Sequence, residues 1–357
     1  MDGPFARFDG HEQVVFGNDP DTGLRAIIAI HSTTLGPALG GTRFYPYADE
    51  SAALTDVLRL SKAMAYKGAA AGLDLGGGKA VIIGNPATDK SEALLRAYGR
   101  LVESLGGRYV TACDVGTYPS DMALVARETR WATGADPVEG GSGDSGVLTA
   151  HGAFVGLQAS VAEVWGSSSL KGRHVAIQGV GKVGRRLAVS VHQAGGQVTV
   201  ADANDDATAW CVEHLGAEVV STDKIHAVDA DVFSPNALGA VINDDTIPEL
   251  QCRVVAGAAN NQLAQPHHAE VLTDAGVLYA PDFVLNAGGV IQVADELHAG
   301  GYSGARATAR TEQIGPRLRQ IFAIARDQGI TTAAAADHFA EQRMAGVGRL
   351  RAFWLPS

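Results

Sequence analysis

The sequence has few cysteines, no excess of basic residues and no long uninterrupted apolar run. Its three cysteines, Cys113, Cys211 and Cys252, are widely spaced and odd in number, which favours a reducing compartment over a disulfide framework. The net charge of −11 disfavours binding to nucleic acid or to an anionic membrane. No Cys-x-x-Cys pair, signal peptide or eighteen-residue apolar window is apparent. We therefore expect a cytoplasmic protein with no metal site, no nucleic-acid partner and no membrane partner.

The length of 357 residues and the 46% hydrophobic content are typical of a globular protein with two domains. Strand-like and helix-like patterns alternate through the first part of the chain, which predicts an α/β domain. The predicted strands are 13–19, 24–33, 80–84 and 108–114, and the predicted helices are 51–70, 90–107 and 120–130. The polar, glycine-rich segment 134–146 is the best candidate for a hinge or mobile loop.

A dinucleotide-binding pattern follows the predicted strand 174–178. Its glycines have the spacing GxGxxG and are followed by a helix and by a second strand, 197–202, which is the context that gives the pattern weight. The first glycine would form the turn, the second would admit the pyrophosphate, and the helix N-terminus would attract it. The predicted cofactor-binding residues of this loop are Gly179, Gly181, Lys182, Val183 and Gly184.

Asp202 closes the second strand, eighteen residues after Gly184. A carboxylate there accepts hydrogen bonds from a ribose 2′-hydroxyl and repels a 2′-phosphate, which favours NAD over NADP. The alternative is a turn residue at the end of the strand, and Asp205 and Asp206 compete for the same role.

Three further strand signals, at 231–236, 252–263 and 277–289, complete a doubly wound sheet. Ligands of such sheets lie beyond the carboxyl ends of the strands. Polar residues there are candidates for cofactor or substrate contacts, although a single asparagine in a turn is more often a capping residue. The candidates are Asn260, Asn261 and Asn286, with Thr149 as a further cofactor candidate.

Two helix patterns, 309–329 and 332–350, end the chain. We expect residues 1–147 to form an α/β domain for substrate binding and catalysis, and residues 148–328 to form a Rossmann NAD-binding domain. The C-terminal segment 329–357 is expected to join the first domain, with a cleft between the two domains.

The stretch GLDLGGGKAVIIGNP places Lys79 directly behind three glycines. A P-loop would need a glycine where Leu73 stands and a hydroxyl residue where Ala80 stands, so that interpretation is excluded. The glycines would instead allow close approach of the backbone and a small substrate, with Lys79 delivered into an apolar cleft.

Over nearly the whole chain, the sequence resembles the glutamate, leucine, phenylalanine and valine dehydrogenases. The segment LDLGGGKAVIIGNP fits the active-site pattern of that family, and LGPALGGTRFYPY, MAYKGAAAG, TACDVGT, GAANNQL and NAGGVIQVADEL follow in the expected order. The resemblance implies reversible oxidative deamination of an L-amino acid to a 2-oxo acid and ammonia, coupled to reduction of NAD. We also expect a homo-oligomer.

The resemblance implies that Lys79 activates water, that Asp114 exchanges protons with the substrate amine, and that Lys67 binds the α-carboxylate. A buried lysine beside another cation can lose its proton near neutral pH, which suits Lys79 to this task. Gly40 and Gly41 would bring backbone groups near the substrate, and Asn261 would contact it. Taken alone, Lys67 could be a solvated lysine at a helix end, and Asp114 could cap the following helix.

Substrate choice depends on a few apolar positions. Glutamate-specific relatives have a lysine where this chain has Leu39, so an acidic substrate would lack its partner and an apolar one is favoured. The resemblance implies a pocket made by Leu39, Ala112, Val290 and Val293. Its small residues favour phenylalanine as the substrate, with leucine or valine as the alternative.

Two other functions compete with an amino acid dehydrogenase. A non-catalytic NAD-binding protein would not require Lys67, Lys79 and Asp114 together. A hydroxy-acid dehydrogenase would need a histidine base, and none of the histidines lies in a carboxylate-flanked motif; those considered are His31, His151, His267 and His268.

Overall fold

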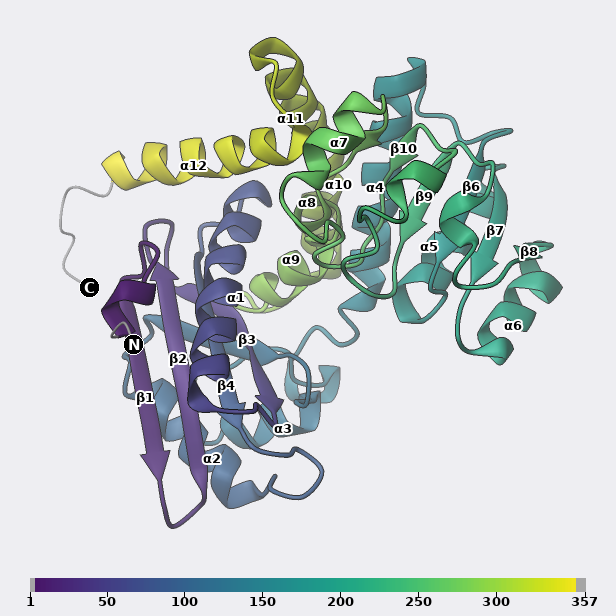
Figure 1. Cartoon of the computed structure of the whole chain (residues 1–357). Helices are drawn as coiled ribbons and strands as arrows, with labels where there is room; N and C mark the ends of the chain where they lie inside the picture. The colour runs from purple at the N-terminus through teal and green to yellow at the C-terminus, as the bar shows by residue number, and fades with distance from the viewer. Residues whose placement is uncertain (1–3, 351–357) are drawn as a thin grey trace. The chain divides into compact units, whose positions relative to one another are not determined.

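The computed structural model describes residues 4–350, which form two compact units (Figure 1). The first unit contains residues 4–143, 292–304 and 340–350, and the second contains 144–291 and 305–339. Three short segments depart from the domains expected from the sequence. Residues 292–304 belong to the first unit rather than to the predicted NAD domain, and residues 144–147 and 329–339 belong to the second unit rather than to the first.

The first unit is built on a mixed five-stranded sheet of order β1-β2-β4-β3-β5. Strands β1, β2 and β4 are antiparallel neighbours, whereas β3 runs parallel to both β4 and β5. Sequence patterns predicted every strand except β3, whose central glycines hide its alternation. The bounds are β1 (Gln13–Asp19), β2 (Leu24–Ser32), β3 (Ala38–Tyr45), β4 (Gly76–Ile83) and β5 (Tyr109–Cys113).

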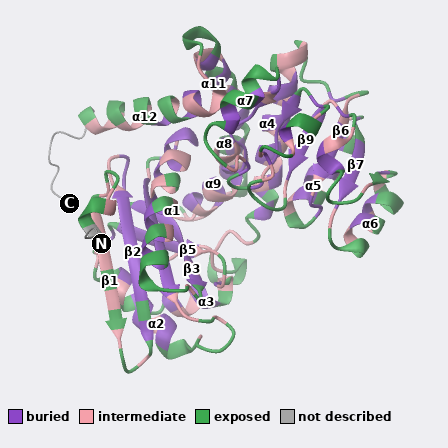
Figure 2. Cartoon of the chain, in the orientation of Figure 1, coloured by how far each residue is buried: buried purple, intermediate pink, exposed green. Residues whose placement is uncertain are grey.

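Helices cover both faces of this sheet (Figure 1). Helix α1 (Glu50–Ala70) begins at Asp49, whose side chain accepts a hydrogen bond from the backbone N–H of Ala52, and packs its apolar residues on one face. Helices α2 (Glu92–Glu103) and α3 (Pro119–Val125) cover the other face. The central strands β2 and β4 are consequently buried, while β1 at the edge is partly exposed (Figure 2).

The glycine run before Lys79 belongs to strand β4, which begins at Gly76 rather than at the predicted position 80. A Cβ added to Gly77 would lie 2.1 Å from the backbone nitrogen of Ala65 in α1. A Cβ added to Gly78 would lie 2.7 Å from the ring of Tyr109 on the other face. The glycines are therefore required because helix and strand backbones approach each other more closely than a side chain allows.

The second unit contains a six-stranded parallel sheet of order β11-β10-β9-β6-β7-β8. Read from β8, this is the 3-2-1-4-5-6 order of a doubly wound dinucleotide-binding sheet, which confirms the predicted fold class. The strands are β6 (His174–Gln178), β7 (Gln197–Ala201), β8 (Glu218–Val219), β9 (Val232–Pro235), β10 (Val254–Val255) and β11 (Leu278–Tyr279).

The central helix of the second unit is α4 (Gly146–Trp165), which packs on α11 (Ile314–Gln328) through small residues. A Cβ added to Gly152 would lie 2.7 Å from Cδ1 of Ile314. Within residues 4–350, α4 is the one helix long and apolar enough to cross a membrane by length and composition, which the search for apolar runs missed. Half of its most apolar window is buried, as expected for a core helix.

The sequence patterns predicted the helix after the glycine loop and the C-terminal helices, but not the helices over 205–215, 268–274, 282–285 and 288–295. The predicted strand signal 277–289 is a strand only at Leu278–Tyr279. The pattern predicted as one helix over 309–329 is divided at Gln313 into α10 and α11. The remaining helices are α5 (Lys182–Gln193), α6 (Asp205–Leu215), α7 (His268–Asp274), α8 (Asp282–Leu285), α9 (Gly288–Asp295), α10 (Gly304–Glu312) and α12 (Thr332–Leu350), with short 3-10 turns at Pro4–Arg7, Pro137–Glu139, Ile225–Ala227 and Ile247–Glu249.

Candidate functional site

Lys79 and Asp114 form an ion pair on the face of the first sheet that α1 covers. Lys79 Nζ lies 2.9 Å from Asp114 Oδ2, and the side chains are 7% and 23% exposed. Lys79 belongs to β4 and Asp114 follows β5, so strand β3 lies between them in the sheet. The structure thus brings together two of the three ionisable residues predicted for catalysis and substrate binding.

Glycines of β3 make this ion pair possible. A Cβ on Gly41 would lie 2.5 Å from the carbonyl oxygen of Cys113 and 2.9 Å from Cβ of Asp114. A Cβ on Gly40 would lie 1.8 Å from the carbonyl oxygen of Gly78. The immediate effect of both glycines is close packing of the strands, while their predicted contact with substrate stays a prediction.

Asp114 does not cap helix α3, which was the alternative to a functional role. At the start of α3, the backbone N–H of Tyr118 donates to Asp121 Oδ2 at 2.9 Å, whereas the Asp114 carboxylate faces Lys79 and Arg43. Burial favours the neutral form of Asp114, but the charge of Lys79 and then that of Arg43 outweigh burial, so the pKa of Asp114 is lowered. The carboxylate is therefore ionised at neutral pH.

The other predicted substrate contacts belong to both units. Lys67 is half-buried in the last turn of α1. Leu39 and Ala112 are 2% and 8% exposed, and the parallel pairing of β3 with β4 and β5 directs them to the face of Lys79. Val290 and Val293 are half-buried one turn apart on α9, in the second and first unit respectively. A pocket joining all four apolar residues stays a prediction.

The glycine loop of the second unit lies between β6 and β9, where the strand order reverses. Gly179 has φ +86° and a Cβ on it would lie 2.6 Å from Cβ of Ala237, while one on Gly184 would lie 1.9 Å from the carbonyl oxygen of Gly179. A Cβ on Gly181 meets nothing within 4 Å. Gly181 caps helix α5, which begins with Lys182 and Val183, so its backbone is open to a ligand at a helix N-terminus.

Asp202 is connected to this loop. Its Oδ2 accepts from the backbone N–H of Val180 at 2.7 Å, and its Oδ1 accepts from the N–H of Asn204 at 2.9 Å. Asp205 and Asp206 instead begin helix α6 and are exposed. Of the three carboxylates, Asp202 is therefore the one best placed for the ribose contact. The same two hydrogen bonds also fit the alternative, a turn residue at the end of the strand.

The candidate amides form a second polar group in this unit. Asn286 is 7% exposed, and its Nδ2 donates to Asn260 Oδ1 at 2.8 Å. Its Oδ1 is buried and has no hydrogen-bond partner among residues 4–350, so it is an acceptor suited to a ligand amide. Asn261 has φ +52°, which supports its alternative role as a turn residue. Thr149 Oγ1 donates to the carbonyl oxygen of Ser145.

Three features fit a dinucleotide. They are the open backbone at Gly181, the carboxylate of Asp202 and the buried Oδ1 of Asn286, which has no hydrogen-bond partner among residues 4–350. Each of these features belongs to the second unit. The cofactor itself would contribute the acceptor for the hydride.

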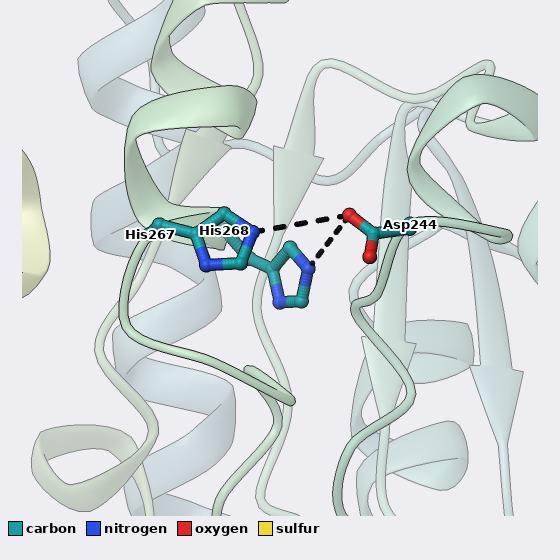
Figure 3. Close-up of side chains that lie close together, drawn as sticks. All are labelled: Asp244, His267 and His268. Atoms are coloured by element: carbon teal, nitrogen blue, oxygen red, sulfur yellow. Dashed lines mark hydrogen bonds and ion pairs between the residues drawn. The ribbon is translucent and has the colours of Figure 1, made fainter.

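Two histidines that the sequence left without a carboxylate lie near Asp244 (Figure 3). Asp244 Oδ1 is 3.2 Å from His268 Nε2 and 3.8 Å from His267 Nε2. Asp244 and His268 are 24 residues apart, so this contact is spatial and does not form a carboxylate-flanked sequence motif. Among the histidines considered, His151 Nε2 also lies 3.9 Å from a carboxylate oxygen, Oε1 of Glu312. His268 Nδ1 accepts from the backbone N–H of Gln265, which places the ring proton on Nε2 facing Asp244 rather than a lone pair available to a cation.

Sequence reasoning missed Arg43 and Asp56, which extend the Lys79–Asp114 pair. Arg43 Nε lies 3.0 Å from Asp114 Oδ2, and its Nη1 lies 2.7 Å from Asp56 Oδ2. The partners are far from Arg43 in sequence, so no local motif joins them. Only once β3 is known to be a strand does its two-residue period place Leu39, Gly41 and Arg43 on one face.

Comparisons with known proteins agree with this fold. Residues 11–131 match the Glu/Leu/Phe/Val dehydrogenase dimerisation domain, and residues 205–352 match the Glutamate/Leucine/Phenylalanine/Valine dehydrogenase family. The chain is 55% identical to valine dehydrogenase of Streptomyces coelicolor, over 94% of this chain and 93% of that protein. It is 49% identical to leucine dehydrogenase of Geobacillus stearothermophilus, over 97% and 94%.

A solved structure extends the comparison to three dimensions. The crystal structure of L-tryptophan dehydrogenase from Nostoc punctiforme has a TM-score of 0.84 and 43% identity, and covers 95% of this chain and 97% of that one.

The fold and the site therefore define an amino acid dehydrogenase. The chain belongs to the glutamate, leucine, phenylalanine and valine dehydrogenase family. Enzymes of this family depend on NAD or NADP, and NAD, the predicted cofactor, is consistent with the family. The names of the relatives favour the valine and leucine alternative over phenylalanine, the substrate that we predicted from residue size.

Proposed function

We propose that this enzyme catalyses the reversible, NAD-dependent oxidative deamination of a branched-chain aliphatic L-amino acid, valine or leucine. The observation that carries the proposal is the buried Lys79–Asp114 pair beside the apolar side chains of Leu39 and Ala112. An acid–base pair and an apolar wall on one sheet face suit a substrate with a reacting amine and an aliphatic side chain.

The two charged side chains divide the proton transfers. Bound NAD would supply the acceptor for the hydride from Cα, and water would then attack that carbon. Lys79 in its neutral form takes a proton from this water, while the Asp114 carboxylate exchanges protons with the substrate amine. Lys67 keeps its charge and holds the α-carboxylate.

Leu39 supports the choice of side chain. It is almost fully buried, so an acidic substrate placed against it would lose its hydration without gaining a partner charge. The similarity to valine and leucine dehydrogenases favours a small aliphatic side chain over a phenyl ring.

Asp202 supports NAD as the preferred cofactor. Its carboxylate lies beside the glycine loop through the hydrogen bond to Val180 N–H, and a negative charge there opposes a 2′-phosphate. We expect Asp202→Ala to raise the KM for NAD and to relax discrimination against NADP, with Asp205→Ala as the control that changes neither. Unchanged preference in Asp202→Ala would move the ribose contact to another residue.

We further propose a cytoplasmic homo-oligomer assembled through the first unit. The name of the matched N-terminal family domain refers to dimerisation, and edge strand β1 carries Phe16 with 59% of its surface exposed. The three cysteines are free thiols, as expected in a reducing compartment. Light scattering of the purified protein tests the oligomer, and a mass equal to one chain would contradict it.

The deciding experiment measures kcat/KM for L-valine, L-leucine, L-phenylalanine, L-glutamate and an L-hydroxy acid at alkaline pH with NAD. We expect valine or leucine to exceed phenylalanine at least tenfold, about 1.4 kcal/mol in transition-state binding. A preference for phenylalanine would restore the choice made from residue size. Turnover of the hydroxy acid alone, or NAD binding without any turnover, would overturn the proposal.

The substrate wall is tested by Leu39→Lys. An ammonium group beside the substrate side chain should lower kcat/KM for valine and leucine about tenfold or more, and it should improve the relative activity on glutamate. Val212→Lys, an exposed substitution on α6, is the matched control and should leave all ratios unchanged. If the ratios of kcat/KM between amino acids do not change in Leu39→Lys, Leu39 does not line the substrate pocket.

A further inference from the structure

Arg43 of β3 connects the Lys79–Asp114 pair to a second carboxylate on helix α1. Its Nε lies 3.0 Å from Asp114 Oδ2 and its Nη1 lies 2.7 Å from Asp56 Oδ2. The Arg43 side chain is 23% exposed and that of Asp56 is 16% exposed, so water screens this chain of charges only partly. Tyr47 Oη donates a further hydrogen bond to Asp56 Oδ2 at 2.7 Å.

Lys79 and Arg43 donate to the same oxygen of Asp114, Oδ2. This arrangement fixes the plane of the carboxylate and directs Oδ1 as the oxygen that can meet a substrate amine. It also gives Asp114 a counter-ion that does not depend on Lys79, because a guanidinium keeps its proton at every working pH whereas an ammonium can release one.

The need for a second cation follows from the proposed function. If a buried carboxylate had Lys79 as its only partner, loss of the lysine proton would leave an uncompensated buried charge, which is strongly unfavourable. The lysine would then hold its proton and could not serve as a base. With Arg43 present, Asp114 remains paired after Lys79 becomes neutral.

We propose that Arg43 is a positioning residue that keeps Asp114 ionised and oriented, and that it thereby allows Lys79 to act as the base. Asp56 has the opposite electrostatic effect, because its charge partly offsets that of Arg43. The inference rests on the proposed deamination reaction. A purely structural role for Arg43, joining β3 to α1, is the competing explanation.

The charged and titratable groups around this centre come from each neighbouring element. Those in contact with one another are Lys79 on β4, Arg43 on β3, Tyr47 after β3, Asp56 and Arg59 on α1, and Asp114 after β5. Cys113 of β5 also interacts with the charge of Asp114, and Lys67 lies in the last turn of α1. Arg59 contacts Asp56 Oδ1 at 3.4 Å but is 62% exposed, so its effect is screened. Arg43 and Asp56 are therefore the two charges whose removal should act most clearly on the pair.

Two charge-neutralising variants give opposite predictions for the pH at which deamination activity rises. In Arg43→Gln, Asp114 has only Lys79 as counter-ion, so the lysine holds its proton longer and the kcat/KM profile should move up by about one pH unit. In Asp56→Asn, Arg43 is no longer offset, so the profile should move down by a few tenths of a unit. A structural link between β3 and α1 would not produce shifts of opposite sign.

Arg43→Lys and Arg25→Met complete the design. Arg43→Lys keeps the positive charge but loses the planar guanidinium that donates to Asp114 and Asp56 together. We therefore expect kcat to fall roughly tenfold while the pH profile stays near that of wild type. Arg25 pairs with Glu50 at 2.7 Å and likewise joins a strand to α1, but it is not part of the Asp114 network. Arg25→Met should therefore alter neither kcat nor the profile.

The measurement is kcat/KM against pH on the best amino acid substrate, with thermal unfolding of each variant as the control for folding. An unshifted profile in Arg43→Gln, or shifts of the same sign in Arg43→Gln and Asp56→Asn, would overturn the role of Arg43. If Arg43→Gln does not fold, the downward shift in Asp56→Asn decides, and its absence counts against the proposal. Wild type inactive on every amino acid would instead refute the proposed function.

Discussion

Glycines serve opposite purposes in the two units. In the first sheet, a Cβ on Gly40 would lie 1.8 Å from a backbone atom, and a Cβ on Gly77 would lie 2.1 Å from one. Neighbouring backbone therefore occupies the space that a side chain would need. In the second unit, a Cβ on Gly181 would meet nothing within 4 Å. The glycines of the first sheet allow the close strand packing that positions Lys79 and Asp114. Gly181 of the second unit instead leaves its backbone open to a ligand.

The two candidate sites differ in charge as well. The site of the first unit is held together by Lys79, Asp114 and Arg43, which contact one another. The site of the second unit offers open backbone at Gly181, the neutral acceptor of Asn286 and one carboxylate, that of Asp202, which accepts hydrogen bonds from backbone N–H groups. We infer that reacting groups are supplied by the first unit and that the second supplies mainly binding groups, a difference that mutations can test.

The largest expected effect is that of Lys79→Ala. Loss of the base should lower kcat by about 10²–10⁴-fold. Lys67→Ala, from the same face, should mainly raise the KM for the amino acid because it removes a partner of the α-carboxylate. Steady-state kinetics at several pH values measure both variants. Equal losses of kcat would show that the two lysines do not divide the tasks.

A smaller effect should follow Gly77→Ala. The added methyl group must displace α1 from β4, which we expect to cost about 1–3 kcal/mol of unfolding free energy. Gly346→Ala is the matched control, because that helical glycine has open space around it and alanine should stabilise the helix by about 0.5–1 kcal/mol. Urea denaturation gives both values. A Gly77→Ala variant as stable as wild type would contradict the close approach of helix and strand.

Gly181→Ala should leave stability nearly unchanged, because the methyl group meets no protein atom, and it should raise the KM for NAD about tenfold by blocking the loop backbone. The amino acid KM serves as the internal control. If the KM for NAD stays at its wild-type value while the protein folds normally, the loop does not contact the cofactor and the contrast between the two units fails.

The smallest effect concerns acid stability. The pKa of Asp114 is lowered in the folded protein, because Lys79 and Arg43 outweigh burial, so the ionised carboxylate stabilises the fold above its unfolded pKa, near pH 4. This contribution is lost as pH falls through the folded pKa. Asp114→Asn should therefore show a shallower loss of unfolding free energy below pH 4. If the unfolding free energy falls equally with pH in the variant and in wild type, Asp114 does not contribute to acid stability.

Sequence patterns predicted those parts of the fold that depend on residues close together in the chain. The alternation of 13–19 and the glycine loop after β6 each depend on neighbouring residues. Strand β3 was missed because Gly40 and Gly41 carry no side chain to show alternation. The Arg43 network was missed because its partner Asp114 lies 71 residues away and is brought close only by the parallel pairing of β3 with β5. The substrate predicted from residue size, phenylalanine, differs from the substrates in the names of the relatives, and residue volumes alone do not define a pocket.

Helix α4 has a consequence for synthesis of the chain. Its glycine-lined surface is covered by α11, which begins at Ile314. A ribosome makes α4 about 150 residues before that partner, so the surface of α4 that packs on α11 stays uncovered while those residues of the 357-residue chain are made. Productive folding of the second unit therefore waits for nearly the whole polypeptide, and truncated translation products will present α4 to chaperones or aggregate.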